Sequence, residues 1–339
     1  MAESGERKRQ ALADDPGAAH LHVEALHRED CRERCADNRS FGAAAAARST
    51  RSSAIATDLD VTLESIHVYP VKSCAGGTPR EAVLGETGLD LDRQWLVVDP
   101  AGVFVTQREL PRMALVQTTL KSSELILRAP GMLAVHVAID RVEERTEVEV
   151  WGDRVAGYDM GALCAQWFSD FLGRPLRLAR FDPEAPRHAD RKWTGSIEAA
   201  NAFQDGFPLL VASAASIDEV NRRLARAGEP AVTLARFRPN LVLGGLDANG
   251  EDHLDEIVFA AAQGPVRLKL VKPCVRCSIP DVDPATGVAG HAVGDVLSHY
   301  RADPRMGGSI TFAMNAVVVE GIDCTLTTGM RGTASYAFA

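Results

Sequence analysis

The sequence lacks the motifs that assign a chain to several large enzyme classes. No Gly-x-Gly-x-x-Gly follows an expected strand into a helix, and neither a Walker loop nor a Gly-x-Ser-x-Gly elbow is present. These absences disfavour dinucleotide binding, P-loop nucleotide hydrolysis and serine hydrolase chemistry. No apolar run approaches the roughly 18 residues that span a bilayer, and the N-terminus has no signal-peptide core. We therefore expect a cytoplasmic protein with no membrane contact.

A basic surface and a disulfide framework are also missing. The 339-residue chain has 46 Asp and Glu against 37 Lys and Arg, a formal net charge of −9. Nucleic acids and anionic lipids attract basic surfaces, so this balance argues against either as the main partner. The seven cysteines are odd in number and mostly isolated. A reducing compartment fits this pattern best.

The pattern of apolar residues predicts mixed β structure with few helices, an α+β class. Residues 1–57 show no sustained periodicity, and we expect a disordered tail there. Short β-rich runs separated by turns follow from Val61 to Trp151 and indicate a barrel or sandwich rather than a βαβ sheet. Helical spacing predicts a helix over 161–172. Ser216-Ile217-Asp218-Glu219 resembles a capping box that opens a second helix.

Cys274-Val275-Arg276-Cys277 places two thiols and a guanidinium before a segment rich in Pro and Asp. A dithiol redox pair normally lies at a helix N-terminus, and Pro280 and Pro284 disfavour a helix here. A structural zinc site needs four ligands, and no second Cys-x-x-Cys or paired His follows. Two readings remain open at this point. In the first, one thiolate binds a softer metal or a metal cofactor and Arg276 binds its anionic groups. In the second, both cysteines are half-buried at a strand end and have no such role.

Polar clusters occur at four expected strand ends, where binding sites are commonly built. Each alone is typical of solvated surface, but together they indicate a basic pocket for an anionic, phosphate-bearing ligand. The clusters are Lys72-Ser73, Asp92-Arg93, Thr106-Gln107-Arg108 and Arg236-Phe237-Arg238-Pro239-Asn240. Residues 187–201 are polar and irregular, and we expect them to form a loop over the site. We expect the four tryptophans to pack in cores; they are Trp95, Trp151, Trp167 and Trp193.

Five motifs in order carry a family resemblance. They are IHVYPVKSC at 66–74, LDRQWLV at 91–97, VTQRELPR at 105–112, FRPN at 237–240, and CVRC at 274–277 with DPATG at 283–287. Over about residues 61–320 the chain resembles MOSC-domain proteins with the N-terminal MOSC extension, such as the mitochondrial amidoxime-reducing component and its bacterial homologues. The resemblance implies an N-terminal β-barrel-like MOSC domain at 58–180, packed on a β-barrel MOSC domain at 181–339.

The family binds molybdenum cofactor, a molybdopterin whose dithiolene sulfurs and one protein cysteine hold the metal. The resemblance implies Cys277 as the metal ligand and catalytic residue, with Cys274 as a neighbour. Arg276 would favour the thiolate form of that ligand. The other residues implied to hold the pterin and its phosphate are Lys72, Ser73, Arg93, Arg238 and, less directly, Asn240.

The implied reaction is the two-electron reduction of small N-hydroxylated compounds (hydroxylamines, amidoximes, N-hydroxylated bases), with oxygen transferred to reduced molybdenum. The chain ends at Ala339 without a four-cysteine ferredoxin signature, so we expect a separate reductase or iron–sulfur protein as electron donor. The sequence departs from the family at Val275, where relatives commonly carry Ser, and over 205–208, where only Asp205 matches. The alternatives are a cofactor-binding or sulfur-handling MOSC module without N-reductase activity, and a structural protein with packed cysteines.

Overall fold

The described part of the chain is mostly β-strand with four helices, which confirms the expected α+β class. The chain divides into two units, Met1–Ala54 and Ile55–Ala339. The computed structural model describes residues 59–141 and 144–337, all within the second unit. The tail expected at 1–57 lies outside the described residues. No described helix is long and apolar enough to cross a membrane.

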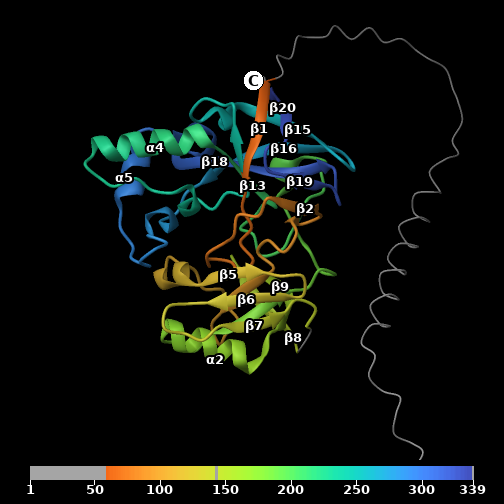
Figure 1. Ribbon diagram of the computed structural model, residues 1–339, viewed down its shortest axis with the longest axis vertical. Helices are drawn as coiled ribbons and strands as arrows, with labels where there is room; N and C mark the ends of the chain where they lie inside the picture. The colour runs from red at the N-terminus through yellow and green to blue at the C-terminus, as the bar shows by residue number, and fades with distance from the viewer. Residues whose placement is uncertain (1–58, 142–143, 338–339) are drawn as a thin grey trace, which may run out of the picture. The chain divides into compact units, whose positions relative to one another are not determined.

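Seven strands close into a barrel, as Figure 1 shows in its upper part. Their order around the barrel is β13-β14-β1-β20-β15-β16-β18, and β18 pairs back with β13. The β13–β14 pair is parallel and the other pairs are antiparallel. The strands are β1 (Leu59–Ile66), β13 (Leu209–Ser213), β14 (Leu241–Gly244), β15 (Leu254–Ala261), β16 (Gly264–Val275), β18 (Ser309–Glu320) and β20 (Arg331–Tyr336).

The barrel interior is filled by apolar residues at alternating strand positions, as the two-residue period of a strand requires. In β1, Val61 and Leu63 are buried, and a bulge between Leu63 and Ser65 brings Ile66 inward as well. β1 completes a barrel whose other strands all follow residue 208. The barrel therefore takes strands from both predicted domains, and the boundary between 58–180 and 181–339 stays a prediction.

Smaller sheets are built mainly from the segment between β1 and β13, and β19 joins one of them from the later part of the chain. One has the order β4-β10-β9-β8, a second β5-β6-β7 and a third β19-β2-β3. Helix α2 (Gly161–Leu172) has the bounds expected from its periodicity, and Gly173 ends it in the left-handed conformation at φ 77°. The strands are β2 (Glu81–Gly85), β3 (Gly88–Leu89), β4 (Trp95–Val98), β5 (Gln117–Leu120), β6 (Glu124–Arg128), β7 (Val135–Ala138), β8 (Arg145–Val150), β9 (Asp153–Asp159), β10 (Arg177–Phe181) and β19 (Thr325–Thr327).

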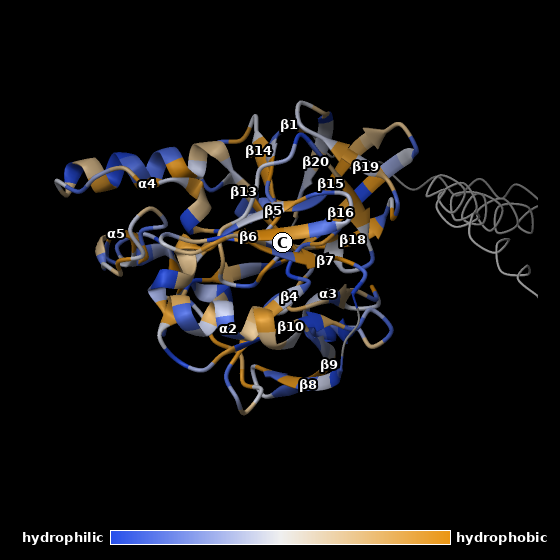
Figure 2. Cartoon of the chain, turned by 60° about the horizontal axis from the view of Figure 1, so that its bottom comes forward, coloured by the Kyte–Doolittle hydropathy of each residue, from blue (hydrophilic) through white to orange (hydrophobic). Residues whose placement is uncertain are grey.

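Helices α4 (Ala214–Arg226) and α5 (Ala292–Ser298) lie side by side beside the barrel (Figure 1). A shared apolar cluster that includes Val220, Leu297 and Phe312 joins them to it. Figure 2 shows hydrophilic and hydrophobic residues alternating along α4, as expected for a helix with one solvated face. The remaining elements are β11 (Arg187–His188), α3 (Arg191–Thr194), β12 (Ala200–Asn201), β17 (Ala302–Asp303), and short 3-10 turns at Pro111–Leu115, Leu234–Arg236, Gly250–His253, Ile279–Asp281 and Pro304–Met306.

The predicted capping box at Ser216 is wrong. Ser213, extended at φ −98° and ψ 150°, is the N-cap of α4, and its side chain accepts a hydrogen bond from the Ser216 backbone N–H. The Ser216 hydroxyl instead donates to the buried Glu251 carboxylate at 2.8 Å. Glu219 forms ion pairs with Arg222 and Arg223. The helix thus starts directly at the end of β13, one turn before the expected position.

Candidate functional site

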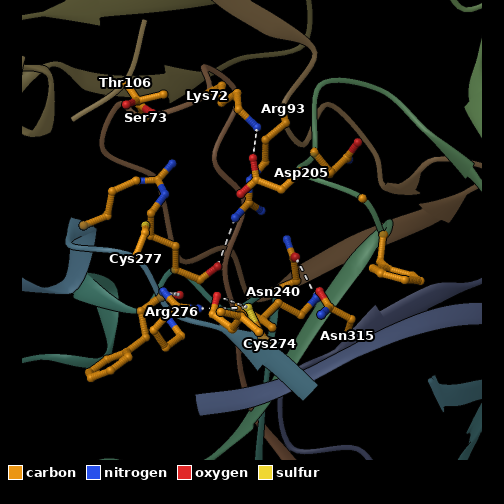
Figure 3. Close-up of a pocket in the computed structure, with 18 of the residues that line it drawn as sticks. Lys72, Ser73, Arg93, Thr106, Asp205, Asn240, Cys274, Arg276, Cys277 and Asn315 are labelled. Carbon is orange, nitrogen blue, oxygen red and sulfur yellow. Dashed lines mark hydrogen bonds and ion pairs between the residues drawn. The ribbon is translucent and has the colours of Figure 1, made fainter. Parts of the chain in front are cut away.

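A cavity of about 300 Å³ is lined by all seven of the residues predicted for the site, and Figure 3 labels all of them except Arg238. They reach it from four chain segments: the one after β1, the one before β4, the one before β14, and the end of β16. These predicted residues are Lys72, Ser73, Arg93, Arg238, Asn240, Arg276 and Cys277. The structure therefore brings together side chains that are up to about 200 residues apart in the sequence.

Strand register explains why these segments meet. Leu241, the first residue of β14, pairs with Ile66 at the end of antiparallel β1 and with Val211 of parallel β13. The residues that follow β1 and those that precede β14 must therefore emerge at the same end of the barrel. The buried Asn240 amide fixes this junction, because it donates to His67 O at 3.2 Å and accepts from Leu210 N at 3.1 Å.

Arg93 is held by a carboxylate that has no exposure to solvent. One Arg93 nitrogen, Nη1, donates to both oxygens of Asp92 at 2.7 and 2.6 Å, and Asp92 also accepts from Tyr69 N at 2.8 Å. Arg93 Nη2 donates to the Arg238 carbonyl at 3.0 Å. The Asp92 ion pair and this hydrogen bond together hold the Arg93 guanidinium against the segment that precedes β14.

Arg238 lies beside it, and the two guanidinium groups lie over the ring of Tyr69 at 4.2 and 4.4 Å. Arg238 Nη1 donates to Cys74 O at 2.6 Å, while Nη2 is buried with no hydrogen-bond partner among the described residues. Burial, with the nearby Arg93 charge second, lowers the pKa of Arg238 to about 10. Two crowded cations with an unsatisfied donor make a site that an anion would stabilise.

Left-handed backbone is concentrated around this cavity. Eight described non-glycine residues have positive φ, and four of them line the cavity: Ser73 at 65°, Arg93 at 50°, Trp151 at 56° and Arg238 at 59°. Such conformations cost on the order of 1 kcal/mol or more each, and they cluster at binding and catalytic sites because the surrounding structure must impose them.

A second charged group combines Lys72, Asp205 and Trp151. Lys72 Nζ donates to Asp205 Oδ1 at 2.6 Å and to Phe203 O at 2.7 Å, and Trp151 Nε1 donates to the same Asp205 oxygen at 2.9 Å. Burial lowers the pKa of Lys72, although Asp205 opposes the shift. Partial desolvation of the Asp205 carboxylate in the cavity would raise its pKa, but the Lys72 charge and hydrogen bond and the Trp151 hydrogen bond outweigh this effect and hold the pKa well below its ordinary value. Asp205 is therefore a carboxylate at neutral pH.

Cys274 and Cys277 have different surroundings. Cys274 lies near the end of β16 and is partly buried, whereas Cys277 follows the strand and is exposed. Arg276 Nη1 donates to Cys274 Sγ at 3.2 Å, and its Nη2 donates to Phe237 O at 3.1 Å. The expected support of the Cys277 thiolate by Arg276 is thus not a direct contact. No group of three or more His, Cys, Asp or Glu side chains in the described residues could hold a metal.

Trp151 is the main cavity residue that sequence reasoning missed. It was expected in a core, but it is 51% exposed and lines the cavity. It occupies the tight turn between β8 and β9, and Arg108 lies over its ring at 4.5 Å. A tryptophan followed by Gly152 and Asp153 in a hairpin turn was the available signal, because a bulky residue is atypical there. Trp95 and Trp167, by contrast, are core residues as expected.

Comparisons with known proteins agree with this geometry. Residues 60–175 match the family model of the MOSC N-terminal beta barrel domain, and residues 198–321 match that of the MOSC domain. The chain belongs to the MOSC-domain family. It is 33% identical over 254 residues to mitochondrial amidoxime-reducing component 1 of Mus musculus and 34% identical over 254 residues to that of Homo sapiens. The alignments cover 72% of this MOSC protein in both cases, and 72% and 73% of the respective relatives.

A larger relative matches as well. Molybdenum cofactor sulfurase of Homo sapiens is 30% identical over 285 residues, which are 79% of this chain but 31% of the sulfurase. The MOSC protein is therefore homologous to two differently named groups of proteins, and the family alone does not choose between their activities.

Proposed function

We propose that this MOSC protein is a molybdenum-cofactor-dependent oxidoreductase that reduces N-hydroxylated compounds. The observation that carries the proposal is one cavity that combines the exposed Cys277 thiol with a cationic cluster whose Arg238 Nη2 and Arg276 Nε have no described partner. The names of its amidoxime-reducing relatives support the same reaction class.

The donor set fits an anionic cofactor bound through sulfur. Lys72, Arg93 and Arg238 supply positive charge for a phosphate, and an exposed thiol is the kind of ligand that a soft metal centre takes. Ser73 and Asn240 line the same cavity, although the Asn240 amide already has backbone partners. Arg276 donates hydrogen bonds to the Cys274 thiol and to the Phe237 carbonyl. We therefore assign Cys277 as the metal ligand and catalytic residue, and the other six as cofactor-binding or supporting residues.

When bound, the cofactor would supply an acceptor for oxygen and the two electrons of the reduction. The balanced reaction of a hydroxylamine is R–NH–OH + 2 e⁻ + 2 H⁺ → R–NH₂ + H₂O. A separate reductase or iron–sulfur protein would deliver the electrons, and the cytoplasm stays the expected compartment. The protein itself contributes the thiolate, the charges that bind the phosphate and a cavity that orients a small substrate.

The metal content of purified variants tests the ligand assignment. Protein made in a cofactor-competent host should contain molybdenum, Cys277→Ser should lose most of it, and Cys274→Ser, the matched thiol, should keep it. Equal molybdenum in the wild type and Cys277→Ser would overturn the assignment. Turnover of hydroxylaminopurine or benzamidoxime with an artificial electron donor then tests the activity.

The second candidate is a cofactor-binding or sulfur-handling module, which the similarity to molybdenum cofactor sulfurase favours. It shares the cavity and the Cys277 thiol but not the reductase activity. In that case the cofactor or a persulfide would be found at Cys277, and wild-type protein with a full complement of molybdenum would reduce no N-hydroxylated compound.

A further inference from the structure

One acidic side chain lines an otherwise basic cavity. Of the described residues around it, five are Lys or Arg and a single one, Asp205, is acidic. A carboxylate repels the phosphate that the basic residues would bind, so cofactor binding does not explain it. A carboxylate in this position would instead bind a hydrogen-bond donor or a cation.

The two oxygens of Asp205 are used unequally. Lys72 Nζ and Trp151 Nε1 both donate to Oδ1, and Oδ2 has no hydrogen bond or ion pair within the described part of the chain. The Asp205 side chain is 74% exposed, whereas its partner Lys72 is 8% exposed. Figure 3 shows the Lys72 ammonium turned toward the Asp205 carboxylate. Because Asp205 lines the cavity and its side chain is largely exposed, Oδ2 is available to a hydrogen-bond donor of a ligand.

We propose that Asp205 Oδ2 binds the N–H groups of the substrate and selects amidine-type compounds, namely amidoximes and N-hydroxyguanidines. This inference rests on the proposed reductase function and adds a specificity-determining residue to it. A carboxylate pairs well with such groups, because two N–H donors on one carbon match its geometry and the hydrogen bonds are charge-assisted. Trp151 would act as a positioning residue that fixes Oδ1.

The reaction itself would strengthen this pairing. For an amidoxime, R–C(NH₂)=N–OH + 2 e⁻ + 2 H⁺ → R–C(NH₂)=NH + H₂O, with electrons from the separate protein donor proposed above. The N–O bond breaks, the nitrogen gains a hydrogen and the oxygen leaves as water. The amidine is a much stronger base than the amidoxime and takes a further proton to become a cation. Because charge builds toward the product, a fixed carboxylate stabilises the transition state more than the ground state.

Ligand binding to the holoprotein tests the inference without turnover. Benzamidine is a cationic product analogue and benzamide is its neutral isostere, and calorimetry gives both affinities. We expect wild type to prefer benzamidine and Asp205→Asn to weaken benzamidine at least about tenfold while changing benzamide less than about twofold. Asp255→Asn is the matched control, because Asp255 also pairs with a lysine, Lys269, at 2.8 Å but does not line the cavity.

Three outcomes would overturn the inference: no preference for benzamidine in the wild type, an unchanged benzamidine affinity in Asp205→Asn, or an equal loss for both ligands. The last would show that Asp205 only supports Lys72. Asp205→Ser gives the same comparison should Asp205→Asn not fold. The benzamidine and benzamide affinities test the role of Asp205 independently of turnover. A wild-type protein that reduces no N-hydroxylated compound would refute the proposed function instead. With turnover present, Asp205→Asn should lower kcat/KM for benzamidoxime by a larger factor than kcat/KM for a simple alkyl hydroxylamine.

Discussion

Removal of Asp92 should destabilise the protein severely, because Asp92 is the buried partner of the cavity residue Arg93. The carboxylate has no exposure, and the Arg93 side chain that it holds is 11% exposed. Asp92→Ala leaves this guanidinium buried without its counter-ion, at a cost of about 3–5 kcal/mol. The Tyr69 backbone N–H also loses its acceptor, at about 1–3 kcal/mol.

These two losses share one carboxylate, so they do not simply add, and we expect about 4 kcal/mol in total. For a chain of this size the change corresponds to a fall of about 5–8 °C in melting temperature. Differential scanning fluorimetry measures it directly. Glu198→Ala is the control, because the Arg191–Glu198 pair is 76% and 77% exposed and should change the melting temperature by no more than about 2 °C.

A double variant separates charge from packing. Asp92→Ala with Arg93→Leu removes both charges, so it should regain a large part of the stability lost in Asp92→Ala, since an apolar pair carries no desolvation cost. A fall of less than about 3 °C in Asp92→Ala, or no recovery in the double variant, would refute the view that an uncompensated buried cation dominates.

Two further predictions concern pH and backbone conformation. Burial raises the pKa of Glu251 above its ordinary 4.5, Asp252 adds to the shift, and the hydrogen bond from Ser216 opposes it. The folded state therefore binds the Glu251 proton more tightly than the unfolded state does, so the wild type should lose stability relative to Glu251→Gln as the pH rises above 4.5. Melting temperatures of the two proteins measured across this pH range test the prediction. A difference in melting temperature that does not change with pH would contradict it. Gly88→Ala should cost about 3 kcal/mol, because φ is +101° and the added Cβ would lie 2.3 Å from Pro208 O. Gly131→Ala, at φ +76° with open space around it, should cost only about 1 kcal/mol in the same denaturation assay, and equal losses would exclude the steric explanation.

Local pattern predicted elements better than it predicted their partners. Helix α2 was predicted with its bounds because its apolar periodicity and the glycine that ends it lie within one short segment. The start of α4 was misplaced because Ser213 and Ser216 are both suitable caps, and the choice depends on where β13 ends. That β1 closes the barrel with β14 and β20 could not be predicted from periodicity, since these partners are more than 170 residues away in the sequence.

The residues of the site show the same division. Lys72, Arg93 and Arg238 could be predicted from the sequence because each lies in a recognisable motif at an expected strand end. Trp151 could not, because tryptophan side chains are more often buried in a core. Its role depends on a turn that reaches Asp205, 54 positions further along the chain. The pairing of Ile66 with Leu241 that closes one seam of the barrel also brings the Lys72 segment beside Arg238. Closure of the barrel and assembly of the cavity are therefore one structural event, and a one-residue slip in register at this seam would displace the cations and also turn the buried side chains of β1 outward.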